Sequence, residues 1–306
     1  MLAVSTSWDY KPDLNVAEWI AKIKALGVNA IELGYSLNKQ QADQFVQLIP
    51  REGIKVVSIH NFCPTPFDEP SARHVSNHYR LSSIDEEERK KAVYWTCHTI
   101  DTARAVNAGV VVIHAGTVEI LDDSSRELIA MYKDGAGGSS AFKELAQKTM
   151  DARARCRAPF VAALTKSLDE VLVYAQKYGI KIGLETRYYP FEMPNFEEVG
   201  LFLNQFKGRG LYYWHDVGHA ETNERLTIKP HLDFLNAYKK ELIGVHLHGI
   251  RVLRDHLAVF DGDMDIEPKL EFFGKGIIKV IESRYGNYEQ LKEDVKRLRQ
   301  RWPHDD

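Results

Sequence analysis

The feature that most constrains this chain is a set of six apolar runs, each ending in or near a residue type that binds metal ions. Runs of about four to eight β-branched and aliphatic residues are typical of strands buried on both faces. The polar residues that close them are His60, His114, Glu185, Asp216, His246 and Glu282. Since the carboxyl ends of parallel strands lie at the same edge of a sheet, the pattern predicts one shared polar centre.

Predicted strands alternate with predicted helices along the whole chain. Residues 15–26, the first amphipathic segment, begin with Asn15 and Glu18 in a capping-box pattern. Eight strand-helix units without a second domain predict a single (β/α)₈ barrel, the α/β TIM barrel, over residues 1–306. A doubly wound open sheet is the alternative, but eight units favour closure. The strands are expected at 2–7, 29–35, 54–60, 109–116, 180–185, 210–216, 242–248 and 277–282.

The chain is longer than eight units require, and the excess lies mainly at residues 118–160, after the fourth strand. Barrels of this type are typically about 250 residues long, and this chain has 306. The segment contains GAGGSS at 135–140 and the basic stretch KTMDARARCR. We expect a helical insertion on the side of the polar centre, acting as a lid. Its helices could instead form a contact in a homo-oligomer, so the oligomeric state stays open.

Composition argues for a cytoplasmic protein. The formal net charge is −3, so nothing electrostatic demands a polyanionic partner. Cys63, Cys97 and Cys156 are scattered and odd in number, which indicates reduced thiols. The first residues lack the basic and apolar regions of a secretory signal. No run approaches the ~18 apolar residues that a membrane span requires. We therefore expect neither a membrane nor a nucleic-acid partner.

Four of the strand-end residues form a ligand set for one divalent cation. Glu185, Asp216, His246 and Glu282 end four successive strands and are expected to face one another. Three carboxylates and one imidazole are a mostly hard set that suits Mn²⁺, Mg²⁺ or Co²⁺, with Zn²⁺ as a further choice. Carboxylates crowded this closely repel one another, and a divalent cation is the simplest compensation.

The remaining histidines are assigned by their place relative to the strands. His219 follows Asp216 by three residues and can return to the centre from the loop, although the same step is also a pattern for a turn with a helix cap. His60 and His114 approach from the opposite side of the ring. We expect His248 to make a hydrogen bond rather than bind the metal. His215 alternates with Asp216 and should point toward the helices.

With these motifs the chain resembles the xylose isomerase-like barrel superfamily over essentially its whole length. That group includes sugar-phosphate isomerases and epimerases, ketose 3-epimerases, inosose-processing enzymes and endonuclease IV. The resemblance rests on LETR around Glu185, WHDVGHA at 214–220, GVHLHG at 244–249, RDHLAVFDGDMDI at 254–266 and KVIESR at 279–284.

The resemblance implies a sugar or sugar-phosphate isomerase or epimerase that depends on one divalent metal ion. It places the metal on Glu185, Asp216, His246 and Glu282. Proton transfer would then pass through a metal-stabilised enediolate, with Glu185 and Glu282 removing and returning the proton. Arg187 is the first choice for an anion site if the carbohydrate is phosphorylated. The residues expected to bind the substrate are His60, His114, Arg187, His219, His256 and Arg284.

Two other functions stay open. The first is a multi-zinc phosphodiesterase like endonuclease IV, acting on abasic DNA. Against it, Arg254 stands where that branch has an aspartate, two residues before His256. The second is a barrel that binds a metal or a sugar without catalysis. The zinc ligands that the first would use are His60, His114, Glu185, Asp216, His219, His246, His256 and Glu282.

Overall fold

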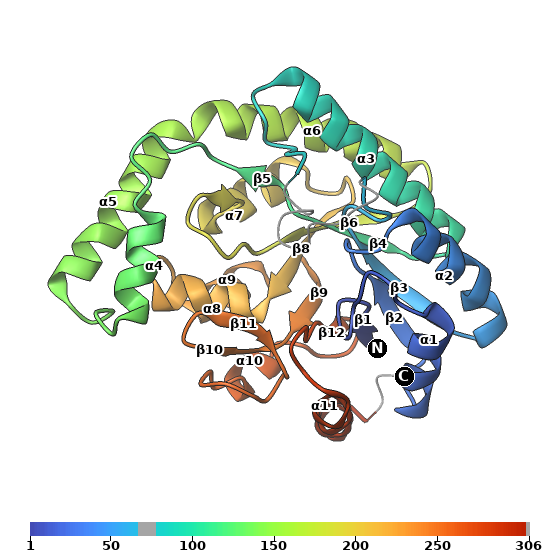
Figure 1. Ribbon diagram of the computed structural model, residues 1–306. Helices are drawn as coiled ribbons and strands as arrows, with labels where there is room; N and C mark the ends of the chain where they lie inside the picture. The colour runs from blue at the N-terminus through green and yellow to red at the C-terminus, as the bar shows by residue number, and fades with distance from the viewer. Residues whose placement is uncertain (67–77, 304–306) are drawn as a thin grey trace.

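The computed structural model describes residues 1–66 and 78–303 and contains a closed barrel of eight parallel strands (Figure 1). Neighbouring barrel strands follow one another around the ring in chain order, and the last strand pairs with the first. This confirms the predicted TIM barrel. The barrel strands are β1 (Leu2–Ser5), β2 (Ala30–Leu33), β3 (Lys55–His60), β4 (Val110–Ile113), β6 (Lys181–Glu185), β8 (Leu211–Asp216), β9 (Leu242–Leu247) and β12 (Ile278–Ile281).

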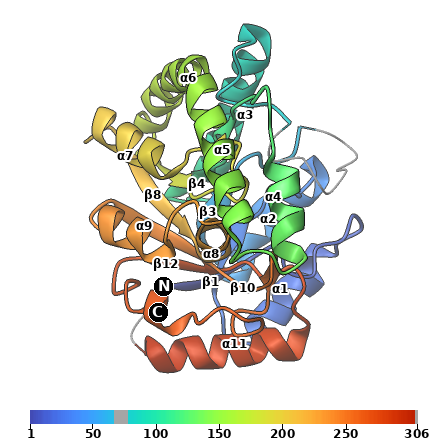
Figure 2. The ribbon, with the colours of Figure 1, turned by 90° about the vertical axis from the view of Figure 1, so that its left-hand side faces the viewer.

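An outer layer of helices surrounds the barrel (Figures 1 and 2). Asn15 caps the first helix by accepting the Glu18 N–H, as predicted, but the Glu18 side chain accepts from the Asn15 side-chain amide rather than from its backbone N–H, so the capping box is only half formed. The helix expected before the last strand is only the four-residue α10. The covering helices are α1 (Val16–Ala25), α2 (Lys39–Glu52), α3 (Glu86–Ala105), α6 (Ala158–Gln176), α7 (Phe196–Gln205), α9 (His231–Tyr238), α10 (Glu267–Leu270) and α11 (Tyr288–Arg301).

Within the described residues, no helix combines the length and the apolar composition that a membrane span needs.

The segment 118–160 contains two helices, α4 (Ser125–Lys133) and α5 (Ser140–Cys156). Leu128 of α4 and Phe142 of α5 share a small apolar cluster with Leu226 and Leu253. Leu226 directly follows α8 (Val217–Arg225). This helix comes immediately after β8, and the strand-helix pattern did not include it. The helical insertion therefore packs against elements that follow β8 and β9. Its role as a lid stays a prediction.

Two small antiparallel sheets lie beyond the carboxyl ends of the barrel strands. β5 (Gly116–Thr117) pairs with β7 (Glu192–Met193), which follows β6. β10 (Gly249–Arg251) pairs with β11 (Arg254–Leu257), which precedes α10. These pairs hold the loops after β4, β6 and β9 in place around the barrel mouth.

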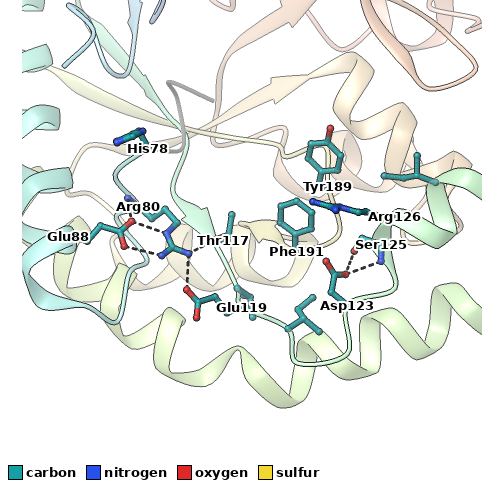
Figure 3. A pocket seen from close by; sticks show the side chains of 13 residues that line it. His78, Arg80, Glu88, Thr117, Glu119, Asp123, Ser125, Arg126, Tyr189 and Phe191 are labelled. Atoms are coloured by element: carbon teal, nitrogen blue, oxygen red, sulfur yellow. Dashed lines mark hydrogen bonds and ion pairs between the residues drawn. The ribbon is translucent and has the colours of Figure 1, made fainter. Parts of the chain in front are cut away.

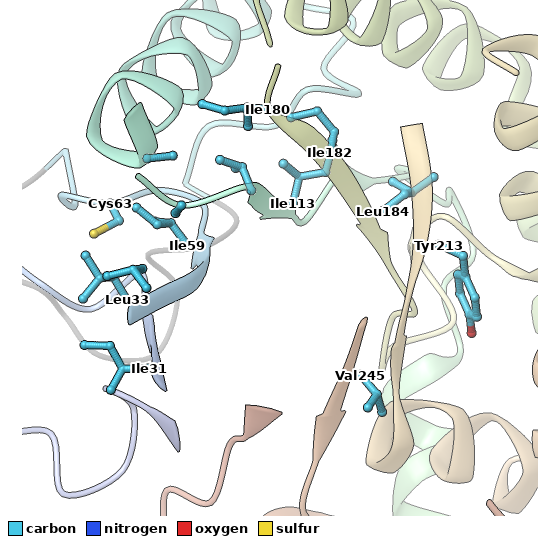
Figure 4. Packing of buried hydrophobic residues seen from close by; sticks show 14 of the residues in the cluster. Ile31, Leu33, Ile59, Cys63, Ile113, Ile180, Ile182, Leu184, Tyr213 and Val245 are labelled. Atoms are coloured by element: carbon cyan, nitrogen blue, oxygen red, sulfur yellow. The ribbon is translucent and has the colours of Figure 1, made fainter. Parts of the chain in front are cut away.

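Alternation along each strand separates an outer apolar core from the barrel interior. Figure 4 shows the outer set, with Leu184, Tyr213 and Val245 pointing toward the helices. The next residue in each of these three strands points inward. These inward residues are Glu185, Trp214 and His246. Because outward and inward residues alternate, the strands that fill the outer core also place the polar side chains of Glu185 and His246 at the mouth of the barrel.

Trp214 is the largest side chain in the barrel interior and is fully buried. It fits because the facing positions on the neighbouring strands are Gly183 and Gly244. A Cβ at Gly244 would lie 2.2 Å from the Trp214 ring, and one at Gly183 would lie 3.1 Å from it. The indole stands edge-on to His246, with ring centres 5.1 Å apart, so it supports the imidazole from below the mouth.

Candidate metal centre

Four strands bring three carboxylates and one imidazole to one point. Glu185 closes β6, Asp216 closes β8, His246 lies in β9 and Glu282 follows β12. All four are buried, and one ligand atom from each lies within 4.8 Å of the others. Nδ1 of His246 is 2.6 Å from Glu185, 3.2 Å from Glu282 and 3.7 Å from Asp216. The structure brings together the four residues that the sequence predicts as metal ligands.

Asp216 is both a member of this cluster and a helix cap. Its Oδ1 accepts a hydrogen bond from the backbone N–H of His219 at 2.8 Å, which caps α8. The same oxygen lies 3.0 Å from Nε2 of His248. Nδ1 of His248 accepts from the backbone N–H of His256, so Nε2 is the nitrogen that donates to Asp216. The hydrogen-bonding role predicted for His248 is confirmed.

Glu32, on β2, is the main residue of this site that the sequence analysis missed. Its two carboxylate oxygens lie 3.1 and 3.2 Å from Nε2 of His246, on the far side of the ring from the carboxylate cluster. Ser58 donates a further hydrogen bond to Glu32 at 2.7 Å. Metal-binding histidines commonly donate their other N–H to a carboxylate in this way. Glu32 therefore orients His246 with Nδ1 toward the three carboxylates.

Burial and neighbouring charges shift the acid-base properties of the centre. Burial alone would raise the pKa of Glu185, but His114 and His246 hold it well below the ordinary value. Burial raises the pKa of Glu282, and the neighbouring Glu32 adds to the rise. Burial would lower the pKa of His246, but Glu282 and Glu32 hold it well above the ordinary value. The two glutamates that face Nδ1 of His246 thus differ in proton affinity.

His60 and His114 meet the same centre from the opposite side of the barrel. Nε2 of His114 lies 2.5 Å from Glu185 and Nε2 of His60 lies 3.5 Å from it. Nδ1 of His60 bonds the backbone carbonyl of Asn61, which leaves the lone pair of a neutral ring on Nε2. His60, Glu185 and His246 form a second group with metal-binding geometry. Glu185 is therefore shared between two such groups.

A third group consists of His219, Asp255 and His256. Nδ1 of His219 bonds the backbone carbonyl of Thr186, and Nδ1 of His256 bonds that of Glu282. A carbonyl oxygen only accepts, so Nδ1 carries a proton in each ring, and the neutral form of either ring has its lone pair on Nε2, which faces Asp255. The two Nε2 atoms lie 3.6 and 3.7 Å from the Asp255 carboxylate. Sequence reasoning counted Arg254 against a multi-zinc site, but the adjacent Asp255 supplies a carboxylate there.

The two arginines expected to contact the substrate are already paired with acidic or phenolic groups. The guanidinium of Arg187 lies 2.8 Å from Glu185 and 2.7 Å from Glu192. Arg284 donates to the Tyr35 hydroxyl and lies 3.8 Å from Glu282. Both side chains therefore help to hold the acidic residues of the centre in position.

A cavity of about 520 Å³ opens over the cluster. It falls within the size range of pockets for small molecules. Its other walls include Tyr35, Tyr188 and Tyr189. Every residue that the sequence analysis assigned to catalysis or substrate binding lines it: His60, His114, Glu185, Arg187, His219, His256, Glu282 and Arg284.

His215 points away from this cavity, as predicted. Its Nε2 lies 3.0 Å from Nε2 of His231 on α9, and its Nδ1 lies 2.7 Å from the hydroxyl of Tyr213. His231 in turn bonds Glu221. His215 therefore belongs to a buried polar chain between the barrel and the helices.

Comparison with protein families assigns most of the chain to one family. The model of the xylose isomerase-like TIM barrel family matches residues 20–301. A search of curated proteins by sequence finds no significant match.

Solved structures share the fold across nearly their entire length. A D-tagatose 3-epimerase-like protein is 19% identical, with a TM-score of 0.62, over 99% of this chain and 97% of its own. The D-psicose 3-epimerase of Clostridium cellulolyticum H10, solved with D-tagatose, is 11% identical with a TM-score of 0.64, over 99% and 98%. The 3-keto-D-glucoside 4-epimerase of E. coli is 12% identical with a TM-score of 0.65, over 98% of each chain.

Proposed function

The chain belongs to the xylose isomerase-like TIM barrel family, and from this and the geometry of the metal centre we propose that it is a divalent-metal-dependent sugar isomerase or epimerase. The observation that carries the proposal is the placement of Glu185 and Glu282. Their carboxylates lie 2.6 and 3.2 Å from Nδ1 of one buried histidine, His246, so two groups that can accept and donate a proton face the same point.

The residues present fit a divalent cation. Glu185, Asp216, His246 and Glu282 would hold it, because three buried carboxylates at this spacing need a positive charge among them. The bond from Glu32 to Nε2 of His246 supports the fit, since it leaves Nδ1 for the cation. Bound there, the cation would supply Lewis-acid polarisation of a carbonyl and its neighbouring hydroxyl.

The glutamates would carry the proton. One removes the proton from the carbon next to the carbonyl and the other returns it, either to the opposite face or to the neighbouring carbon. Asp216 and His246 would serve mainly as ligands. Arg187 and Arg284 would hold the two glutamates in place through their contacts with Glu185 and Glu282.

A carbohydrate-like substrate fits the surroundings of the centre. The cavity of about 520 Å³ accommodates a small molecule, and the compared structures include epimerases named for D-tagatose, D-psicose and a 3-keto-D-glucoside. The choice between isomerisation and epimerisation depends on which carbon receives the proton.

The test is metal content followed by solvent exchange. Protein purified without added metal or chelator should contain about one Mn²⁺, Co²⁺ or Mg²⁺ per chain by mass spectrometry. In D₂O the loaded protein should introduce deuterium into the carbon next to the carbonyl of ketoses such as fructose and tagatose, and the chelated protein should not. A loaded protein that exchanges no hydroxy-carbonyl compound would leave only a binding function.

A second candidate function is a multi-metal phosphodiesterase that acts on abasic DNA. The observation in its favour is the third group, His219, Asp255 and His256, whose ring nitrogens turn their lone pairs toward one carboxylate. Two or three Zn²⁺ ions per chain, together with cleavage of a duplex that contains an abasic site, would favour this function over the first.

A further inference from the structure

A second, larger cavity lies beside the metal centre. It has a volume of about 1020 Å³ and is lined by residues around β5, from α4 and from the loop before β7 (Figure 3). Tyr189 lines both this cavity and the one over the metal centre. Tyr189 is therefore a wall that the two spaces share. We call this second space the side cavity.

Two stacked aromatic rings form one wall of the side cavity. The rings of Tyr189 and Phe191 lie 5.1 Å apart at an angle of 6°, and Tyr189 is 43% exposed. Two hydrogen bonds fix the loop that carries them: the N–H of Val118 donates to the carbonyl of Phe191 at 2.7 Å, and the N–H of Tyr189 donates to the Glu192 carboxylate. Aromatic faces carry partial negative charge, so they suit the C–H face of a sugar ring.

The opposite wall is polar, and its main cation is already compensated. Arg80 bonds both carboxylate oxygens of Glu88, at 2.8 and 2.9 Å. It also donates to Glu119 at 3.0 Å and to Thr117 at 3.2 Å (Figure 3). A guanidinium with this many acceptors has little capacity left for a phosphate.

The charge around the side cavity favours a neutral ligand. Among the residues that the structure describes, the charged side chains that line it are two guanidinium groups and three carboxylates: Arg80, Arg126, Glu88, Glu119 and Asp123. The excess of carboxylates would repel a phosphate or a carboxylate ligand. The same groups can exchange hydrogen bonds with hydroxyls, since carboxylates accept and guanidinium groups donate.

From these three features we propose that the side cavity binds the second ring of a neutral keto-disaccharide or related glycoside, whose hydroxy-carbonyl unit lies at the metal centre. The inference rests on the proposed function and narrows its substrate class from free sugars to glycosylated ones. Tyr189 would lie at the junction of the two rings, Phe191 would support the stacking surface, and Arg126 and Asp123 would meet the outer hydroxyls.

The test compares keto-disaccharides with fructose on the metal-loaded protein. Turanose, maltulose and isomaltulose join glucose to three different hydroxyls of fructose, and lactulose joins galactose to the same hydroxyl as maltulose, so they cover several directions of extension. We expect at least one of them to exceed fructose in kcat/KM for deuterium exchange and in affinity by calorimetry, by about tenfold, which corresponds to ~1.4 kcal/mol.

Two variants and one control locate the effect. Phe191→Ala removes the stacking support, and Ile129→Trp fills the side cavity from α4. Each should lower kcat/KM for the preferred disaccharide about tenfold and leave that for fructose within about twofold. Leu121→Ala is the control, because Leu121 lies in the loop between β5 and α4, is 93% exposed and does not line the side cavity.

The outcomes separate this inference from the proposed function. Exchange of fructose without any preference for a disaccharide, or with a preference that both variants leave intact, would reject the side cavity as a sugar site and keep the proposed function. Disaccharide binding that depends on Phe191, without exchange of any ketose, would reject the proposed function and keep the sugar site. Absence of both binding and exchange would reject the two together.

Discussion

Glu32 and His246 form a buried pair in which both carboxylate oxygens lie within 3.2 Å of Nε2. We expect Glu32→Gln to lower the affinity for Mn²⁺ by about 10–100-fold, because the neutral amide no longer favours the ring orientation and charge that metal binding needs. Calorimetric titration of the metal-free protein measures this. Ser58→Ala is the control, since it removes one bond to Glu32 and keeps the carboxylate. Unchanged affinity in Glu32→Gln would show that the pair does not support metal binding.

Glu185→Gln and Glu282→Gln should each reduce deuterium exchange into the substrate by about 10²–10⁴-fold, the usual contribution of a positioned acid or base. Circular dichroism should show a retained fold. Metal content must be measured beside the rate, because both residues are also expected ligands. The exposed Glu271→Gln is the matched control and should keep full activity. A double alanine variant at 185 and 282 with full exchange would exclude these residues as proton carriers.

Divalent metal should stabilise the fold, because the folded state alone gathers Glu185, Asp216 and Glu282 around one point. At free Mn²⁺ of 100 times its Kd the expected gain is about 2.7 kcal/mol, or roughly 5 °C in Tm for a domain of this size. Thermal unfolding with Mn²⁺ and with EDTA measures it. Asp216→Asn should shrink the shift. Equal Tm values in the two conditions would argue against a metal at this cluster.

Arg153→Met should destabilise the protein by about 3–5 kcal/mol, the usual cost of leaving one buried charge unpaired. Arg153 of α5 is 1% exposed and bonds both carboxylate oxygens of Glu198 at 2.7 Å. Urea unfolding gives the free energy. Arg155→Met, at an exposed position of the same helix, should change it little. The double variant Arg153→Met/Glu198→Gln should recover part of the loss, and no recovery would mean that the ion pair is not the cause.

Asp294→Asn should stabilise the protein at neutral pH. Burial raises the pKa of Asp294 to about 6 from its ordinary 3.8, so the folded state binds more protons between these values. Stability of the natural chain should therefore fall as pH rises from about 4 to 6, by at most ~3 kcal/mol. We expect a gain of roughly 1–2 kcal/mol for the variant at pH 7.5 and almost none at pH 4. An equal gain at both pH values would assign the effect to packing.

The fold was predictable because the strands combine two strong signals. Each barrel strand is an apolar run of the right length, and the segments between most of them carry helical spacing. The weaker elements were missed for physical reasons. α8 begins at Val217, directly after its cap Asp216 and inside a motif interpreted as metal-binding, and α10 covers a single turn. The paired strands β5, β7, β10 and β11 are two to four residues long, too short for any period to appear.

The candidate site was predictable only where a ligand lies at the end of a strand. Glu32 lies within β2 with Ile31 and Leu33 on either side, and the inward direction of alternate residues could have revealed it. Asp255 lies in β11, and the next residue, His256, has a φ of 54°. No strand or helix period fixes the direction of a side chain beside a residue with positive φ. From the sequence we therefore considered Arg254, and not Asp255, in assessing a multi-zinc site.

The fit of Trp214 against Gly183 and Gly244 makes the three positions interdependent in evolution and in engineering. A side chain added at Gly244 would collide with the indole, and a smaller residue at 214 alone would leave a void next to His246. In homologues, a smaller residue at position 214 should therefore occur together with a larger residue at position 183 or 244. Libraries that aim to remodel the metal centre of this barrel should vary all three positions together. The Trp214 ring packs against the predicted ligand His246, and a change in volume at one position must be compensated at another.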